Sequence, residues 1–348
     1  MQPKESVRNM APYNPPTSSR SDFIRLDFNE NTSGCSPKVL QALRTITEKE
    51  FCMYPEYNEL KNDIAKLNDI DKNKIIPTNA GDEGIMLVMN TFIEKGDDIL
   101  LPTPTFAMFK FYAQLNDADI KEVQYNENLL FPIDNLLNKI NEKTKMIILV
   151  NPNNPTGTSI KRDDIIRVLE KAKDSIVFLD EAYYDFTKNT CIDLIDKYQN
   201  LVILRSFSKA FGLGGLRLGY LISNKENIKI FQKVNSPYSI SFIANKVLKA
   251  AIEDFDYVDN YVSQIMKNKE FLYNEFEKMN IKYYKGDANF FLADFGESYK
   301  IIYDKLKERG ILLRDRNSYV KNTLRITVGT KKQCELLIKE LNEIWMKR

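Results

Sequence analysis

Hydrophobic and polar residues follow two different spacings along the first two thirds of the chain. An apolar residue at every third or fourth position is typical of a helix that buries one face, and this spacing predicts helices over Lys38–Lys49, Glu59–Leu67, Glu83–Ile93 and Arg162–Lys173. Short unbroken apolar runs are typical of buried strands, and they predict strands at Asp98–Leu101, Met146–Val150, Ile176–Leu179 and Leu201–Leu204. Helices that alternate with such strands predict an α/β fold, with a mostly parallel sheet flanked by helices.

The pattern changes near residue 246. Long charged amphipathic helices are predicted over Ala251–Asn280, and short strands near Asn289–Asp294 and Leu324–Val328, which indicates a smaller α+β domain. The first three dozen residues are rich in Pro, Ser and Asn, and they predict an extended arm that joins the small domain or a partner subunit. We therefore expect an arm over residues 1–36, a large domain over 37–245 and a small domain over 246–348.

Composition narrows the chemistry. The 348 residues carry 50 Lys and Arg against 48 Asp and Glu, and this balance favours a small-molecule partner over nucleic acid or a membrane surface. The N-terminus has no apolar leader segment, so we expect a cytoplasmic enzyme. The chain has no histidine and only four scattered cysteines, which argues against a Ser-His-Asp triad, an imidazole base and a metal site. Lysine, tyrosine, carboxylates, cysteine or a bound cofactor must carry the chemistry.

Polar segments follow three of the predicted strands. They are Asn151–Gly157, Asp180–Tyr183 and Arg205–Lys209, and a glycine-rich turn around Arg217 comes shortly afterwards. Ligands of open α/β sheets bind at the carboxyl ends of the strands, so we expect these segments to meet at one site. There they would bring together an amide, a carboxylate, a phenol, hydroxyl groups, an amine and a guanidinium.

The order and spacing of these residues resemble the fold type I pyridoxal-phosphate enzymes, specifically the aminotransferases, over nearly the whole chain. The resemblance implies that the large domain binds pyridoxal 5'-phosphate and that Lys209 forms the covalent link to the cofactor aldehyde. Lys209 would then move the proton between the substrate Cα and the cofactor. Asp180 would keep the pyridine nitrogen protonated, so that the ring withdraws electrons. Asn154 and Tyr183 would hydrogen-bond the ring hydroxyl.

The same resemblance implies a cradle for the cofactor phosphate. Its members would be Ser206, Ser208, Arg217 and the backbone N–H groups of Gly81 and Asp82 at a helix start, where anions bind favourably. Phe106 would stack on the pyridine face; many relatives carry tyrosine there, so this chain keeps the ring and lacks the hydroxyl. Tyr54 would reach the cofactor phosphate of the neighbouring subunit, which makes a homodimer part of the prediction.

Within the aminotransferases the chain resembles the histidinol-phosphate branch, through the segments Val7–Tyr13, Leu26–Asn31, Asp82–Glu83 and Leu312–Thr330. That resemblance implies transfer of the amino group from L-histidinol phosphate to 2-oxoglutarate in histidine biosynthesis, giving imidazole acetol phosphate and L-glutamate. The substrate phosphate would be held by Tyr13, Asn154, Arg314 and Arg325. Two guanidinium groups suit this task, because each can donate two parallel hydrogen bonds to phosphate or carboxylate oxygens.

Other activities use the same residues. A threonine-phosphate decarboxylase would share the fold, the lysine and the phosphate-holding arginines, and an aminotransferase acting on aromatic amino acids would share the fold and the lysine. The segment Ser206–Lys209 also matches the S-x-x-K motif of serine acyl-transfer enzymes, but the companion S-D-N and K-T-G motifs are absent from the chain. The aminotransferase and decarboxylase interpretations both remain open, and the segment Asn29–Asn31 favours the aminotransferase.

Overall fold

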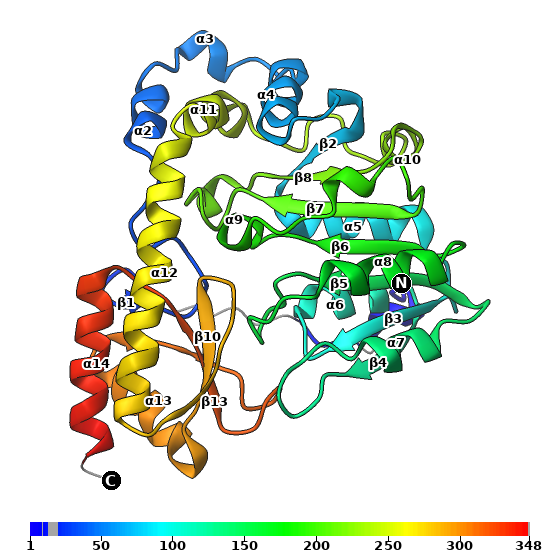
Figure 1. The fold of residues 1–348 in the computed structure, drawn as a ribbon. Helices are drawn as coiled ribbons and strands as arrows, with labels where there is room; N and C mark the ends of the chain where they lie inside the picture. The colour runs from blue at the N-terminus through cyan, green and yellow to red at the C-terminus, as the bar shows by residue number, and fades with distance from the viewer. Residues whose placement is uncertain (9, 13–19, 347–348) are drawn as a thin grey trace.

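The computed structural model describes residues 1–8, 10–12 and 20–346. Its centre is a seven-stranded sheet in the order β2-β8-β7-β6-β5-β3-β4 (Figure 1). The strands are β2 (Ile75–Thr78), β3 (Asp98–Thr103), β4 (Asp119–Gln124), β5 (Thr144–Val150), β6 (Ile176–Asp180), β7 (Leu201–Ser206) and β8 (Gly219–Ile222). Five neighbouring strands, from β7 to β4, run parallel, and β8 is antiparallel to both of its neighbours. The predicted α/β fold with a mostly parallel sheet is confirmed.

Helices cover both faces of this sheet because its central strands are apolar on both sides. Met146 and Ile148 of β5 pack with α5, α6 and α10, whereas Ile147 and Leu149 pack in the core on the other face with α4, α7 and α8. The helices of the first group are α5 (Ala80–Phe92), α6 (Ala107–Leu115) and α10 (Lys225–Phe231). Those of the second are α4 (Asn58–Asn68), α7 (Ile133–Lys139) and α8 (Arg162–Lys171), and the short α9 (Tyr184–Thr187) follows β6.

A second, antiparallel sheet has the order β12-β13-β10-β9. Its strands are β9 (Lys282–Tyr284), β10 (Phe290–Asp294), β12 (Arg314–Asp315) and β13 (Thr323–Thr327), and the helices near it are α12 (Phe255–Lys278), α13 (Tyr299–Glu308) and α14 (Lys331–Trp345). From the N-terminal segment, β1 (Ile24–Arg25) pairs in parallel with β11 (Ile311–Leu312). The long helix α12 runs from the upper helical layer down to this sheet (Figure 1). The ranges given above for the arm, the large domain and the small domain remain predictions.

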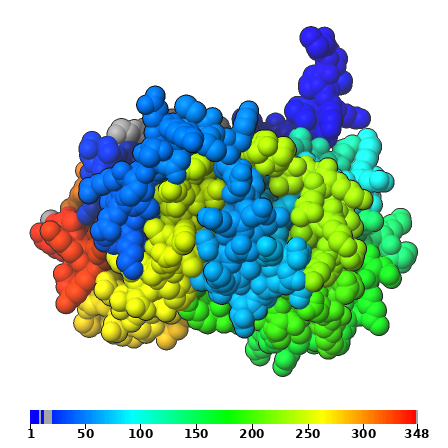
Figure 2. Space-filling model, turned by 90° about the horizontal axis from the view of Figure 1, so that it is seen from above, coloured from blue at the N-terminus to red at the C-terminus, as the bar shows by residue number. Residues whose placement is uncertain are grey.

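One of the predicted helices is divided in the structure. Instead of one helix over Lys38–Lys49 there are α2 (Pro37–Arg44) and α3 (Glu48–Phe51), because Thr47 and Glu50 form a capping box that begins a new helix. The predicted stretch Ala251–Asn280 contains the end of α11 (Phe242–Ile252) and then α12. Figure 2 shows α2 to α4 in blue beside α11 in yellow, and the N-terminal residues with α1 (Glu5–Arg8) project beyond the body. Across the described residues, none of the helices combines the length and apolarity needed to cross a membrane.

Candidate active site

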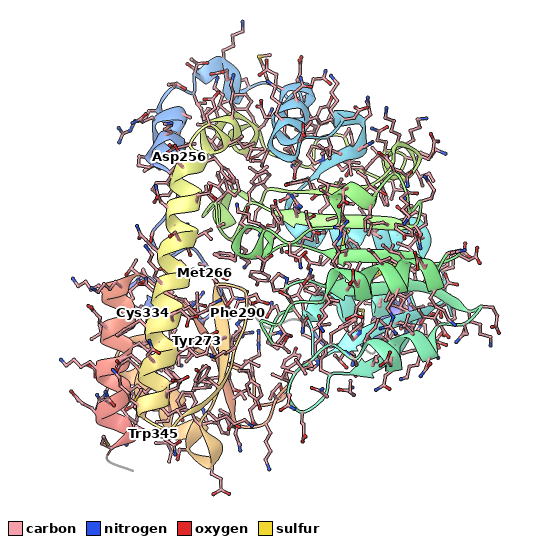
Figure 3. The ribbon with its side chains drawn as sticks, in the orientation of Figure 1. Asp256, Met266, Tyr273, Phe290, Cys334 and Trp345 are labelled. Carbon is pink, nitrogen blue, oxygen red and sulfur yellow. The ribbon has the colours of Figure 1, made fainter. Side chains whose placement is uncertain are left out.

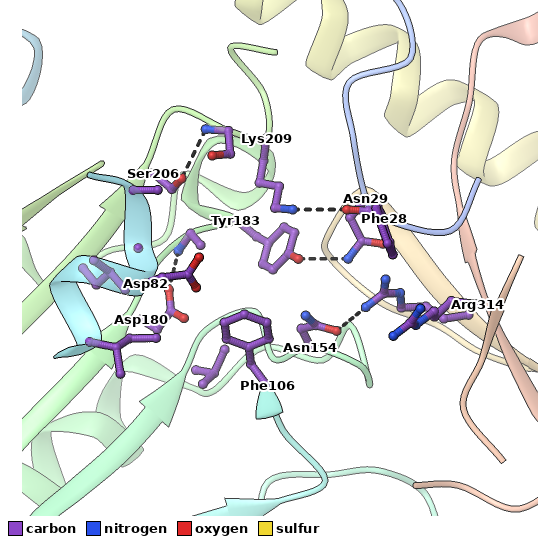
Figure 4. A pocket seen from close by; sticks show the side chains of 18 of the residues that line it. Phe28, Asn29, Asp82, Phe106, Asn154, Asp180, Tyr183, Ser206, Lys209 and Arg314 are labelled. Carbon is purple, nitrogen blue, oxygen red and sulfur yellow. Dashed lines mark hydrogen bonds between the residues drawn. The ribbon is translucent and has the colours of Figure 1, made fainter. Parts of the chain in front are cut away.

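A cavity lies where the carboxyl ends of β5, β6 and β7 meet the start of α5 and the strands β12 and β13 (Figure 4). Twelve of the fourteen predicted site residues line it: Gly81, Asp82, Phe106, Asn154, Asp180, Tyr183, Ser206, Ser208, Lys209, Arg217, Arg314 and Arg325. The parallel strands end at one edge of the sheet, so segments separated by dozens of residues converge there. The roles given to these residues remain predictions.

The other two predicted residues do not join this group. Tyr54 is 75% exposed and is not among the residues that line the cavity; its ring stacks on that of Tyr238, with the centroids 4.5 Å apart. Tyr13 lies outside the described residues. Within this chain, therefore, Tyr54 does not contact its own site, and the expected contact would have to be made to a second copy.

Asp180 ends β6 and is buried beneath the cavity. Its Oδ1 accepts a hydrogen bond of 2.9 Å from the N–H of Ala182, and burial raises the pKa of the carboxyl to about 7 against the weaker opposing effect of Lys209. A buried carboxylate is stabilised by a cation placed against it. A protonated ring nitrogen is such a partner, so the environment of Asp180 fits the predicted role.

A buried ion pair holds the strand ends from the side away from the cavity. Arg205, one residue before Ser206, donates from Nε and Nη2 to Oε2 of Glu181, one residue after Asp180, over 2.9 and 2.8 Å. Both side chains are almost wholly buried, and the guanidinium also lies 3.6 Å from the ring centroid of Tyr184. This pair ties the ends of β6 and β7 together, so the residues that face the cavity keep a fixed separation.

Lys209 follows β7 and extends into the middle of the cavity. Its Nζ donates to the carbonyl oxygen of Phe28 over 3.2 Å and lies 5.7 Å from the ring centroid of Tyr183. The hydroxyl oxygen of Tyr183 accepts from Asn29 Nδ2 over 2.9 Å. An amine and a phenol therefore lie beside the carboxylate of Asp180, as Figure 4 shows.

The wall of the cavity formed by the start of α5, Ser208 and Arg217 fits a phosphate. The helix α5 presents its first N–H groups there, and Gly219 allows this close approach because a Cβ at that position would lie 2.8 Å from the carbonyl carbon of Ala80. Ser208 Oγ is buried with no hydrogen-bond partner in the described part of the chain. Arg217 donates to Asp82 over 2.6 Å, so the predicted phosphate ligand lies at the cradle but pairs there with a carboxylate.

These features together fit pyridoxal 5'-phosphate. The unpartnered Ser208 hydroxyl and the α5 N-terminus suit the phosphate, Asp180 suits the ring nitrogen, and Lys209 suits the aldehyde. Phe106 forms part of the lining and supplies an aromatic face. The donor and acceptor groups thus match a phosphorylated pyridine along its whole length.

Arginines gather at the far end of the cavity. Arg325 of β13 is buried, donates to Asn154 Oδ1 and, over 2.6 Å, to the carbonyl oxygen of Asp27, and its Nε has no partner among the described residues. Burial and the neighbouring Arg316 lower the pKa of Arg325 to about 9, while Arg314 adds a smaller effect of the same sign. This repulsion between cations means that an anion bound here would be strongly favoured.

Eight lining residues are not among the predicted ones, and three of them carry polar or aromatic groups into the cavity, namely Phe28, Asn29 and Arg316. Phe28 and Asn29 lie in the segment Leu26–Asn31, which was noted as a resemblance without assigned roles. Arg316 could have been found from its spacing, because residues two apart on an extended strand face the same side, and Arg314 was already predicted to face the substrate.

The family comparison agrees with this geometry. The model of the family described as aminotransferase class I and II matches residues 21–341. A histidinol-phosphate aminotransferase from Caldanaerobacter subterraneus subsp. tengcongensis is 36% identical over 331 residues, which is 92% of each chain. The chain belongs to the class I and II aminotransferases. The predictions of a pyridoxal-phosphate cofactor and of aminotransferase activity are thereby confirmed.

Solved structures show how widely the fold is shared. A histidinol-phosphate aminotransferase from Sinorhizobium meliloti in complex with pyridoxal-5'-phosphate has a TM-score of 0.85 and 23% identity, covering 93% of this chain and 91% of that one. An L-threonine-O-3-phosphate decarboxylase from Porphyromonas gingivalis has a TM-score of 0.80 and 23% identity, covering 93% and 100%. At this identity the aminotransferase and that decarboxylase share the fold type I architecture alone, so the fold does not separate their substrates.

Proposed function

We propose that this aminotransferase moves the amino group of L-histidinol phosphate to 2-oxoglutarate, giving imidazole acetol phosphate and L-glutamate in histidine biosynthesis. The observation that carries the proposal is the cluster of Arg314, Arg316 and Arg325 at the end of the cavity opposite the cofactor cradle. Three guanidinium groups suit a phosphate dianion, and their paired N–H groups would also donate hydrogen bonds to the carboxylate of the second substrate. The 36% identical relative named histidinol-phosphate aminotransferase supports the same substrate.

Some residues of the chain would hold the cofactor, and Lys209 would transfer the proton. Bound pyridoxal phosphate would supply an aldehyde for the substrate amine and a ring that withdraws electrons from Cα. Lys209 would act as general base and acid, taking the proton from Cα and returning it to the cofactor carbon. Asp180 would stay anionic against the ring nitrogen and Phe106 would cover the ring face.

Asn154 and Tyr183 would connect the cofactor to the substrate anion. Asn154 Oδ1 accepts from Arg325, while Nδ2 of the same amide would donate to the ring hydroxyl. Tyr183 accepts from Asn29 and would donate its own proton to that hydroxyl. The position of the ring is thus linked to that of the guanidinium which holds the substrate.

An assay with parallel donors tests this proposal. The purified protein, loaded with pyridoxal phosphate and supplied with 2-oxoglutarate, is given L-histidinol phosphate, phenylalanine or threonine phosphate, and both glutamate and CO₂ are measured. We expect glutamate to form fastest with histidinol phosphate. Glutamate from phenylalanine alone would indicate an aromatic aminotransferase. CO₂ from threonine phosphate without glutamate would indicate a decarboxylase, which is the activity named for the Porphyromonas structure.

Replacing Arg314 should weaken binding of the phosphorylated donor more than it slows the reaction. A hydrogen bond to a charged group contributes about 1.5–3 kcal/mol, so Arg314→Gln is expected to raise the KM for histidinol phosphate by roughly 10-fold to 150-fold with a smaller effect on kcat. Lys300→Gln, on the exposed face of α13, is the control for loss of a surface charge. An unchanged KM in Arg314→Gln would remove this residue from the substrate site.

We also propose that two copies of the chain pair in the cytoplasm through the face shown in Figure 2. Large hydrophobic side chains are exposed at Leu40, Phe51, Met53, Tyr54 and Tyr238, with exposed fractions from 53% to 75%. Such a group favours burial against another surface, and Tyr54 would then reach the partner's cofactor phosphate. Sedimentation equilibrium is expected to give twice the chain mass; a monomer would contradict the proposal. The four cysteines are free, as is usual in a reducing compartment.

A further inference from the structure

Helix α12 carries a lysine that is buried almost completely, with 1% of its surface exposed. The Nζ of Lys269 donates to the carbonyl oxygens of Gly286 and Ala288, over 2.6 and 2.9 Å. Burial lowers the pKa of this amine to about 8, while Asp287 and Glu270 oppose the shift. A buried amine is unfavourable unless it is hydrogen-bonded, so its two bonds hold the loop to the helix and keep the amine satisfied.

The loop that Lys269 holds contacts the polar loop after β5, and the contact is made by backbone atoms of both loops. The N–H of Asp287 donates to the carbonyl oxygen of Gly157 over 2.7 Å. A Cβ built on Gly286 would lie 3.0 Å from Gly157 Cα, and one built on Gly157 would lie 3.2 Å from Gly286 Cα. We call the contact of Gly157 and Gly286 the glycine joint; here a loop of the large sheet touches a loop of the small sheet without side chains between them.

The loops on both sides of the glycine joint are connected by hydrogen bonds to residues that line the cavity. Gly157 closes the loop that carries Asn154, and Asn154 accepts a hydrogen bond from Arg325 on β13 of the other sheet. On the opposite side, Asn289 donates from Nδ2 to the carbonyl oxygen of Asn29 over 3.2 Å, and Asn29 donates to Tyr183. A shift of the joint would therefore displace groups at both the substrate end and the cofactor end.

Helix α12 also fixes the end of the strand that carries Arg325. Asn268, the neighbour of Lys269, donates to the carbonyl oxygen of Gly329, just after β13, over 2.9 Å. In Figure 3, the part of α12 between the labelled Met266 and Tyr273 lies beside β10 and its labelled Phe290. Two consecutive side chains of one helix thus hold the beginning of β10 and the end of β13, and these two strands pair with each other.

We propose that Lys269 is a positioning residue of the active site: by holding Gly286 and Ala288 it sets the place of Arg325 relative to Asn154, and so the affinity for the substrate anion. Lys269 touches neither substrate nor cofactor and acts through the glycine joint. The inference rests on the proposed function insofar as the anion is the substrate's phosphate.

The test compares Lys269→Met with Lys267→Met, which makes the same change at an exposed position of the same helix. Lys269→Met is expected to raise the KM for histidinol phosphate about tenfold and to lower kcat less, by about twofold, because a displacement smaller than 1 Å should cost less than the roughly hundredfold loss of a full 1 Å misplacement. The dissociation constant of inorganic phosphate, measured by calorimetry on the cofactor-loaded protein, is expected to rise by the same factor. Lys267→Met should change neither value.

A comparison of Lys269→Met with Leu337→Ala distinguishes a positioning role of Lys269 from a purely structural one. Leu337→Ala removes a buried side chain from α14, and we expect a lower melting temperature with an unchanged KM. If Lys269→Met lowers the melting temperature in the same way and leaves KM and phosphate binding unchanged, the proposal is wrong. Should Lys269→Met fail to fold, Gly286→Ala displaces the glycine joint directly and should raise the KM; a normal KM there overturns the proposal.

Failure of the proposed function would be visible separately in these experiments. If wild-type protein turns over phenylalanine or threonine phosphate instead of histidinol phosphate, the substrate assignment is wrong. The KM comparison is then made with that donor, whose acidic group would contact the same arginines. A raised KM in Lys269→Met still supports the positioning role, and an unchanged one still rejects it.

Discussion

Lys209→Ala protein is expected to lose nearly all transamination activity, with kcat lowered by about 10⁴-fold. No other lysine lines the cavity within the described residues, so no second amine can replace the one that moves the proton. The variant should still bind pyridoxal phosphate through the α5 N-terminus, Ser206 and Ser208, but the visible absorbance of the bound cofactor should change because the covalent link is lost. Glutamate formation and the absorbance spectrum measure the two effects.

Two comparisons make the Lys209 result specific. Lys225→Ala removes an exposed lysine after β8 and should retain normal turnover. Adding a small primary amine such as ethylamine to Lys209→Ala should restore part of the activity, because the amine can occupy the vacated position. Turnover of Lys209→Ala near the wild-type rate would show that another group is the base.

Asp180→Asn should slow the reaction by roughly 10³-fold, the loss typical when one preorganised electrostatic group is removed from an active site. The amide keeps the size of the side chain but cannot hold a proton on the ring nitrogen, so the ring would withdraw electrons poorly. Single-turnover measurement of the first half-reaction isolates this step from product release. Unimpaired turnover would exclude Asp180 from the role.

The same substitution should stabilise the protein when the cofactor is absent, and the gain should depend on pH. Burial raises the pKa of Asp180 from 3.8 to about 7. Above pH 7 the carboxyl is ionised in both the folded and unfolded states, so the folded state bears the full cost of the buried charge. Between pH 7 and about 4 the folded state takes up the proton first and the cost declines to zero.

Thermal melts of the cofactor-free proteins check this sign. Asp180→Asn should melt at a higher temperature than wild type at pH 8, and the difference should shrink towards pH 4. Lower stability of the variant at pH 8 would mean that the carboxylate is already stabilised without the cofactor. The expected pattern, a gain in stability with a loss of activity, is typical of a group placed for function.

The fold was predictable where local pattern and burial agree. The apolar runs of β5, β6 and β7 appear in the sequence because these strands are covered on both faces by helices. The division between α2 and α3 was not predicted, although the capping pair Thr47 and Glu50 is visible in the sequence, because the helical spacing continues across it. A periodic pattern shows which face of a helix is buried, but it does not locate the residue at which one helix ends and the next begins.

The candidate site was predictable to the extent that its residues follow strand ends. Asn154, Asp180 and Lys209 each follow an apolar run, and parallel strands bring such positions to one edge of the sheet. Phe28 and Asn29 gave no such signal, because they come from the N-terminal segment and reach the site through contacts with residues more than 150 positions away. A local pattern carries no information about which distant segment closes a cavity.

The sequence by itself therefore determined the α/β class, the polar segments that follow the central strands and the likeness to aminotransferases. All three depend on local spacing and residue type. Only the tertiary structure decided that Asn154 pairs with Arg325 and that Lys269 holds the glycine joint. These are contacts between elements far apart in the chain, and they depend on how the two sheets pack against each other. Packing of this kind is a property of the whole fold, and no single segment specifies it.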